Sequence, residues 1–240
     1  MSKNITISII SHRQINLVEK LLLDLEKYDF YKKIILTVNV NENINILKNF
    51  KKLSLKIIEN KKPKGFGENH NFAFGYCNTD YFLILNPDVR INEFNIKNLL
   101  NIFNDKYVYT VAPVAVNNHG LIQDNARKFP NITDIFFRVF KKNIDYHNYD
   151  NIFEVDWISG MFMLFKSIKY REISGFDENF FLYYEDVDIC KRIKVSGGKI
   201  VVCNNERVIH VGQRMSRSNI YYFLMHMRSL LRYHYKKYGN

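Results

Sequence analysis

The chain has 240 residues, of which 47% are hydrophobic and 25% are charged, a composition that is typical of globular proteins and excludes extended disorder. Ten glycines and four prolines exclude collagen-like and linker-like sequences. The net charge of +11 is compatible with a nucleic acid, an anionic membrane or a phosphate-rich substrate as partner. Amino-acid usage biased toward Lys, Asn, Ile, Phe and Tyr explains the same charge without any partner.

Targeting signals and cysteine pairs are not evident in the sequence. No apolar run approaches the roughly 18 residues that a membrane span needs, and the first residues lack the apolar core of a signal peptide. We therefore expect a cytoplasmic protein. Cys77, Cys190 and Cys203 are widely spaced, which favours buried free thiols over disulfides or a zinc site.

Strand-like and helix-like patterns alternate along the first half of the chain. Ile15, Val18, Leu22 and Leu25 recur with the period of an amphipathic helix. This alternation predicts right-handed βαβ units and a mostly parallel sheet. In chain order we expect a strand at 5–10, that helix, a strand at 33–38, a weak helix at 44–53, a strand at 55–58, a turn at 62–67, a short helix at 68–77 and a strand at 81–85.

The second half is less regular. We expect strands at 107–116 and 161–165, a helix at 185–195 that ends at Gly197 and Gly198, short strands at 199–203 and 207–211, and a last helix at 221–238; residues 117–154 receive no assignment. The last helix carries cations along one side and apolar groups along another: Arg228, Arg232 and Lys236 on the first, and Leu224, Met227, Leu231 and Tyr235 on the second.

An acidic residue follows the strand at 81–85 in the sequence Asn86-Pro87-Asp88. Ligands of parallel α/β sheets bind beyond the carboxyl ends of the strands. Asp88 is therefore placed to hold Mg²⁺ or Mn²⁺ against a diphosphate, because hard cations prefer oxygen ligands. A turn that merely ends the strand explains the same triplet.

Three carboxylates, Glu185, Asp186 and Asp188, open the helix at 185–195. Asp188 can pair with Arg192 one turn later, and acidic residues at a helix start also complement the helix dipole. The aromatic residues at 180–184 would carry Asp186 into an apolar cleft, where a carboxylate can act as a general base on a sugar hydroxyl.

Further candidate residues are single signals with structural alternatives. His210 ends a strand before a loop with Arg214, Ser216 and Arg217, which could supply a metal ligand and a phosphate clamp together. The glycines of 64–71 precede a short helix whose amides could face a ligand. Trp157 is either a core residue or a stacking platform for a sugar ring, and Gly160 would let a ligand approach the backbone.

The order of these motifs resembles that of family 2 glycosyltransferases of the GT-A fold, closest to the rhamnosyltransferase-like branch of bacterial surface-polysaccharide biosynthesis. The resemblance covers about residues 5–238, and the stretch GFDENFFLYYEDVDIC at 175–190 is its most specific part. It implies an α/β, Rossmann-like fold with a mostly parallel central sheet flanked by helices and a C-terminal amphipathic helix. It also implies a single domain, with a nucleotide-sugar-binding half at about 1–110, an acceptor and catalytic half at about 111–218, and the helix at 219–240.

The resemblance also implies roles for individual residues. Asp186 matches the catalytic base, with Glu185 beside it, and Asp88 and His210 match the ligands of a divalent metal, although Asn86 replaces the first acidic ligand of many relatives. The positions that match donor contacts are Ser11, His12, Asn39, Asn41, Lys64, Gly65, Asn69, Asn86, Arg214 and Ser216, and those expected to face the acceptor are Arg127, Trp157 and Gly160.

The expected activity is therefore an inverting, metal-dependent transfer of a sugar, with rhamnose as first choice, from a TDP- or UDP-sugar to a glycan or lipid-linked glycan acceptor. The basic last helix predicts contact with the anionic inner face of the cytoplasmic membrane. A non-catalytic nucleotide- or carbohydrate-binding protein on the same fold is the alternative. Nucleic acid is not expected as a partner, because no helix-turn-helix, RRM or zinc signature is present.

Overall fold

The computed structural model describes residues 4–130, 151–212 and 220–238. Its strands are β1 (Ile5–Ser11), β2 (Lys33–Val38), β3 (Leu55–Glu59), β4 (Tyr81–Leu85), β5 (Val89–Arg90), β6 (Val108–Val116), β7 (Ala126–Arg127), β8 (Ile152–Val155), β9 (Trp157–Ile158), β10 (Phe162–Lys166) and β11 (Lys199–His210). Its helices are α1 (Ile15–Leu25), the 3₁₀ helix η1 (Asn45–Asn49), α2 (Phe66–Phe74), α3 (Ile96–Ile102), α5 (Ser167–Glu172), α6 (Glu185–Val195) and α7 (Ile220–Tyr235).

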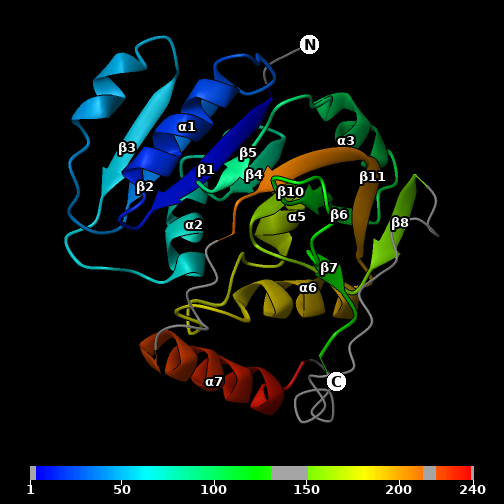
Figure 1. Cartoon of the computed structure of the whole chain (residues 1–240). Helices are drawn as coiled ribbons and strands as arrows, with labels where there is room; N and C mark the ends of the chain where they lie inside the picture. The colour runs from blue at the N-terminus through cyan, green and yellow to red at the C-terminus, as the bar shows by residue number, and fades with distance from the viewer. Residues whose placement is uncertain (1–3, 131–150, 213–219, 239–240) are drawn as a thin grey trace.

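A nine-stranded sheet forms the centre of the molecule, in the order β3-β2-β1-β4-β10-β6-β11-β5, with β8 paired to β11 (Figure 1). The strands β7 and β9 form a separate two-stranded ribbon. The expected α/β fold, with a large central sheet flanked by helices, is confirmed.

The sheet is parallel only in its first half. The strands β3, β2, β1 and β4 pair in parallel, whereas β10 lies antiparallel to both β4 and β6. The start of β10 lies opposite the end of β4, at Phe162 and Leu85, so this strand can only run back along its neighbour. The prediction of a mostly parallel sheet is therefore wrong for the second half, and the sheet is mixed. There, β11 is parallel to β6 but antiparallel to β5 and β8.

Several elements differ from their predicted form. The weak helix expected at 44–53 is only the short η1, and the two strands expected at 199–203 and 207–211 are one strand, β11, with an irregular register between Cys203 and Arg207. The helices α3 and α5 were not expected. The side chain of Asn95 caps α3 by accepting a hydrogen bond from the Lys97 amide, a local signal for a helix start.

Both faces of the sheet are buried. Along β4, Leu83 and Leu85 belong to one apolar core, while Phe82 and Ile84 belong to a second core on the opposite face. Alternate side chains of a strand point to opposite faces, so a continuous apolar run is what a sheet covered on both sides requires. Ligands can therefore reach this sheet only at its ends.

The last helix, α7, packs on the molecule through both apolar and polar groups, and Tyr233 shares a small apolar cluster with Phe180 and Val187. Its buried residues are Ser229, Leu230 and Tyr233, and the Ser229 hydroxyl donates to the Leu182 carbonyl at 2.8 Å. Leu224 is 59% exposed, Leu231 52% and Tyr235 83%. The predicted apolar side of this helix is thus largely exposed to solvent, although the helix itself lies alongside α6 (Figure 1).

Candidate active site

The carboxyl ends of three parallel strands meet at one edge of the sheet. Ser11 ends β1, Asn39 follows β2, and Asn86 follows β4. The Asn39 amide donates to the Ser11 carbonyl at 2.8 Å, which ties the first two of these ends together. This edge is where ligands bind in parallel α/β sheets.

A network of side-chain amides holds the loop before α2 against the end of β2. Asn39 is 5% exposed, accepts a hydrogen bond from the Lys64 amide at 2.8 Å and donates to the Lys64 carbonyl at 2.9 Å. Asn60 donates to Asn39 at 2.8 Å and to Asn69 at 2.7 Å, and Asn69 donates to the Gly65 carbonyl at 2.9 Å. Asn39 and Asn69 thus fix the conformation of the loop before α2, which contains Lys64 and Gly65 and is called the donor loop below. Direct contact of these two side chains with a donor stays a prediction.

The other predicted donor residues on the first two strand ends are more open to solvent. His12 and Asn41 are exposed, and the His12 ring contacts the Asn39 amide at 3.2 Å. The hydroxyl of Ser11 is buried and has no hydrogen-bond partner in the described part of the chain. Sequence reasoning missed Glu42, whose carboxylate accepts from the Arg13 and Ile15 amides at 2.9 and 3.0 Å and joins the loops after β1 and β2.

The donor loop touches the segment that leads into α6. The Phe66 amide donates to the Phe181 carbonyl at 2.9 Å, and a Cβ atom on Gly65 would stand 3.0 Å from the same oxygen. A glycine is needed at this position because the two backbones approach so closely. The predicted donor side and the predicted catalytic side are therefore in direct contact.

Asp88 and His210 lie together because β5 and β11 pair. His210 stands opposite Val89 in this ladder, and its Nε2 lies 3.3 Å from an Asp88 oxygen. The other Asp88 oxygen is buried without a hydrogen-bond partner among the described residues. Adjacent ligands of an octahedral ion with bonds of about 2.1 Å stand roughly 3 Å apart, so the pair fits Mg²⁺ or Mn²⁺.

These two side chains form an incomplete set of metal ligands. Within the described ranges, no group of three or more His, Cys, Asp or Glu side chains is arranged to hold a metal. Asn86, two positions before Asp88, is half-buried, and its side chain is not acidic. Such a site leaves most of the coordination to water and to phosphate oxygens, which is the usual pattern for Mg²⁺ bound with a nucleotide.

The carboxylate of Asp186 is held by two backbone amides. Its oxygens accept from the Gly160 amide at 3.1 Å and from the Val187 amide at 2.8 Å. Burial raises the pKa of Asp186 above its ordinary value, although these amides and the charge of Arg127 oppose the shift. Each carboxylate oxygen has two lone pairs, so both can still accept a proton or a hydrogen bond.

Glu185, next to this carboxylate, is 5% exposed and has one side-chain oxygen without a partner in the described structure. Burial, together with the charge of Asp186, raises the pKa of Glu185 well above its ordinary value. Because Glu185 is the more deeply buried and the less well hydrogen-bonded of the two, we assign the negative charge of the pair to Asp186.

Two hydrogen bonds connect the end of β4, shortly before Asp88, with the segment that holds this base. The Asn86 amide donates to the Met161 carbonyl at 2.9 Å, and the neighbouring Gly160 amide holds Asp186. The end of β4 and the start of α6 therefore meet at the beginning of β10. The predicted ion pair between Asp188 and Arg192 is confirmed at 2.8 Å and fixes α6 from its other side.

The predicted acceptor residues lie on the β7–β9 ribbon and next to it. Arg127 pairs with Trp157 in the ribbon, and its guanidinium lies 5.7 Å from the centre of the indole ring. The indole N–H donates to the Lys128 carbonyl at 3.0 Å, so the ring is fixed but only half-buried. The charge of Arg127 reaches Asp186, which places the ribbon beside the candidate base.

The predicted residues Arg214, Ser216 and Arg217 lie outside the described residues.

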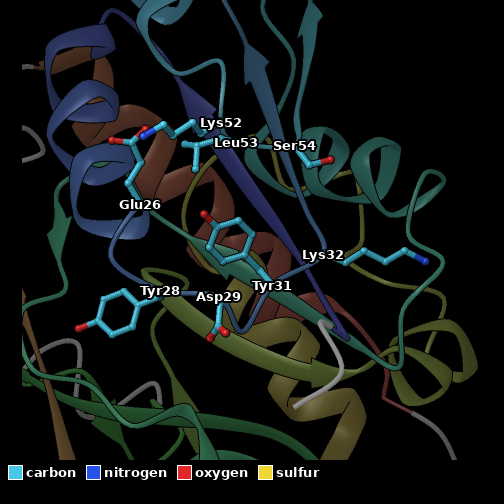
Figure 2. Close-up of a pocket in the computed structure, with 8 residues that line it drawn as sticks. All are labelled: Glu26, Tyr28, Asp29, Tyr31, Lys32, Lys52, Leu53 and Ser54. Atoms are coloured by element: carbon cyan, nitrogen blue, oxygen red, sulfur yellow. The ribbon is translucent and has the colours of Figure 1, made fainter.

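A hollow of about 420 Å³ is lined by residues that include Tyr28, Tyr31 and Ser54 (Figure 2). These residues precede β2 and β3, so the hollow lies at the amino ends of the strands, opposite to the carboxyl ends that form the candidate site. None of the predicted functional residues lines it.

Three relatives match different shares of the chain, from 95% down to 23%. Rhamnosyltransferase WbbL of Escherichia coli (strain K12) is 28% identical in an alignment 243 positions long, which covers 95% of this chain and 91% of that protein. The low-salt glycan biosynthesis hexosyltransferase Agl10 of Haloferax volcanii is 27% identical over 61% of this chain and 48% of its own length. A 56-residue stretch, 23% of this chain and 18% of that protein, is 36% identical to the N-acetylglucosaminyl-diphospho-decaprenol L-rhamnosyltransferase of Mycobacterium tuberculosis.

Solved structures share the fold at low sequence identity. GalNAc-T7 with UDP, GalNAc and Mn²⁺ superposes with a TM-score of 0.67 at 13% identity, over 88% of this chain and 44% of that one. The mannosyltransferase PcManGT of Pyrobaculum calidifontis, in complex with GDP-Man and Mn²⁺, gives 0.66 at 13% identity, over 98% of this chain and 66% of that one.

The family assignment rests on the match to a family model. The model of the glycosyltransferase-like family 2 matches residues 4–218, which include both candidate carboxylate sites. The chain belongs to this family and is a glycosyltransferase.

Proposed function

We propose that this glycosyltransferase moves a sugar, with rhamnose as first choice, from a TDP- or UDP-sugar to a hydroxyl of a glycan or lipid-linked glycan in the assembly of a surface polysaccharide. The observation that carries the proposal is the Asp186 carboxylate, held by two amides next to the buried Glu185. The names of the E. coli and M. tuberculosis relatives support rhamnose. In this proposal residues 1–110 bind the donor and residues 111–218 carry the base and bind the acceptor.

The reaction is a single displacement. Asp186 accepts the proton of the acceptor hydroxyl through a carboxylate oxygen, while the acceptor oxygen bonds to the anomeric carbon and the bond to the nucleoside diphosphate breaks. The raised pKa of Asp186 brings this base closer to neutral pH, where proton transfer is more efficient. Attack opposite to the leaving group inverts the anomeric configuration, so no protein nucleophile is required.

Asp88 and His210 would hold the divalent ion, Mg²⁺ or Mn²⁺. When bound, the ion neutralises the charge that gathers on the diphosphate as the glycosidic bond breaks. Two of the structural neighbours were solved with Mn²⁺, which supports the use of a divalent metal. Ser11, at the end of β1, and Lys64, in the loop before α2, are proposed to contact the donor.

The test is a transfer assay with TDP- and UDP-sugars and a lipid-linked N-acetylglucosaminyl diphosphate, with and without Mn²⁺. Transfer to the acceptor with an inverted anomeric centre, dependent on the metal, is expected. A parallel thermal-unfolding series measures nucleotide binding, which at about 100 times Kd adds about 2.7 kcal/mol, or roughly 5 to 10 °C. Stabilisation by a nucleotide without any transfer or donor hydrolysis would favour a non-catalytic binding protein instead.

We also propose that the outer side of α7 rests on an anionic membrane, where a lipid-linked acceptor would be presented. No helix of the described residues is long and apolar enough to cross a bilayer, so this contact would be peripheral. Exposed Leu224, Leu231 and Tyr235 share the outer side with Arg228 and Arg232, and 220–238 contains no acidic residue. An isologous dimer through this side would bring like charges together without a counter-charge, which favours anionic lipid.

Sedimentation with phosphatidylglycerol and with phosphatidylcholine vesicles tests the membrane contact. The paired change Arg228→Gln and Arg232→Gln is expected to weaken binding to the anionic vesicles at least tenfold, because each cation near the surface contributes about 1 kcal/mol. Leu121→Gln, which changes an equally exposed leucine on another surface, serves as control. Equal binding by all variants would contradict the proposal, as would a dimer that dissociates on changing Leu224 and Leu231.

A further inference from the structure

The side chain of Gln123, a residue to which the sequence patterns assign no role, makes two hydrogen-bond contacts with His210. The Gln123 side-chain nitrogen donates to the His210 carbonyl at 2.8 Å, and its side-chain oxygen lies 2.7 Å from His210 Nδ1. The opposite ring nitrogen, Nε2, faces Asp88. The amide therefore contacts both the backbone and the ring of the same histidine.

These two contacts fix where the proton of the neutral ring lies. A main-chain carbonyl can only accept, so the nitrogen of the Gln123 amide must face it and the oxygen must face Nδ1. That oxygen can also only accept, so Nδ1 carries the proton. Nε2 of the neutral ring is then left with its lone pair, directed to the side of Asp88.

The position of Gln123 is itself fixed by the sheet. Its backbone amide donates to the Ala115 carbonyl at 2.8 Å, on β6, which pairs with β11. Just before it, Ile122 forms a bridge with Val116 and closes the preceding turn. Gln123 lies in no strand, but these two backbone contacts with β6 hold it beside β11, the strand that ends at His210.

We propose that Gln123 is a positioning residue that keeps His210 in the Nδ1-protonated tautomer, with Nε2 available to a divalent cation. Without it, the ring is free to place its proton on Nε2 and donate to Asp88 at 3.3 Å, which would occupy both metal-ligand candidates with each other. The inference rests on the proposed metal site. Outer groups that orient a ligating histidine typically change metal affinity about 10- to 100-fold.

Two measurements test the proposal without the sugar-transfer reaction. Mn²⁺ binding is followed by electron paramagnetic resonance, and the His210 tautomer is read from imidazole ¹⁵N shifts, assigned with His210→Ala. Gln123→Met, similar in size but unable to hydrogen-bond, is expected to weaken Mn²⁺ binding at least tenfold and to move the His210 proton to Nε2. Gln123→Glu keeps an acceptor opposite Nδ1, so it is expected to retain the native tautomer and to bind Mn²⁺ more tightly than Gln123→Met.

Leu121→Ala, on the same turn and 65% exposed, controls for general disturbance of the turn. A native tautomer with Mn²⁺ affinity within twofold of the wild type in Gln123→Met would overturn the proposal, as would equal losses in the Met and Glu variants. If the wild-type protein itself bound no Mn²⁺, the proposed metal site would fall. The ¹⁵N shifts would then still decide whether Gln123 sets the tautomer.

Discussion

The donor side and the catalytic side of the candidate site differ in how their buried polar groups are satisfied. On the donor side, Asn39, Asn60 and Asn69 bond to one another and to the loop before α2. On the catalytic side, one oxygen of Glu185 and one of Asp88 are buried without a partner in the described parts of the chain.

The difference separates groups that build the site from groups that can act in it. A buried amide with its hydrogen bonds made stabilises one loop conformation. A buried carboxylate oxygen without a partner costs free energy and is seldom kept without a chemical use. The donor side has exceptions of its own, because the hydroxyls of Ser11 and Thr37 and the Nε2 of His70 are also buried without a partner among the described residues. Of these groups, Ser11 stands at the carboxyl end of its strand, and we expect it to contact the donor.

The largest expected effect comes from Asp186→Asn. The change removes the proposed base but keeps an oxygen that can accept from the Gly160 or Val187 amide, so transfer is expected to fall by about 10²- to 10⁴-fold. The melting temperature should stay close to that of the wild type. Steady-state release of nucleoside diphosphate in the presence of acceptor measures the first quantity, and circular dichroism the second.

The control for this variant is Asp105→Asn, which makes the same chemical change at an ion pair with Lys199 on the far side of β6. It should leave transfer unchanged. Transfer by Asp186→Asn at more than a tenth of the wild-type rate would show that Asp186 is not the general base.

A smaller effect, on folding stability rather than on transfer, is expected from Asn39→Ala. The change leaves the Lys64 amide and the Asn60 side chain without their shared acceptor, which should cost about 1 to 3 kcal/mol of folding stability. Urea unfolding at fixed pH measures this loss. Ser11→Ala removes only an unpartnered hydroxyl and is expected to leave stability within about 0.5 kcal/mol while raising KM for the donor. Equal stability of the two variants would remove the distinction between the two sides.

The smallest effect concerns the pH dependence of stability through Glu185. Its pKa is raised in the folded protein, so the folded state binds more protons than the unfolded chain above pH 4. Stability should therefore fall as pH rises from about 4 toward the folded-state pKa, by at most about 1.4 kcal/mol per pH unit for one proton. Glu185→Gln should flatten this slope. Melting temperatures between pH 4.5 and 8 measure it, and an unchanged slope would mean that Glu185 is charged throughout.

Local sequence determined most of the elements. The strands β2 and β4 and the helix α6 have the predicted bounds, because apolar runs and helical periods act over a few residues. The sequence also identifies Asp88, Asp186 and His210 as candidate site residues, since each stands near the end of a strand or the beginning of a helix. The family resemblance joined them into one site, and the match over residues 4–218 confirmed the family.

Only the tertiary structure decided which of these residues meet, and how. Gln123 bonds to His210 across 87 positions of sequence, and Glu42 accepts hydrogen bonds from amides 27 and 29 positions away. No local sequence pattern signals contacts over such separations. The direction of β10 was set by its entry at the end of β4. The orientation of α7 was set by Ser229, Leu230 and Tyr233, which are buried, and by the ion pair of the following Lys236 with Asp188 on α6. Hydrophobic period fixes which side of a helix is apolar, but the packing partners decide which side is buried.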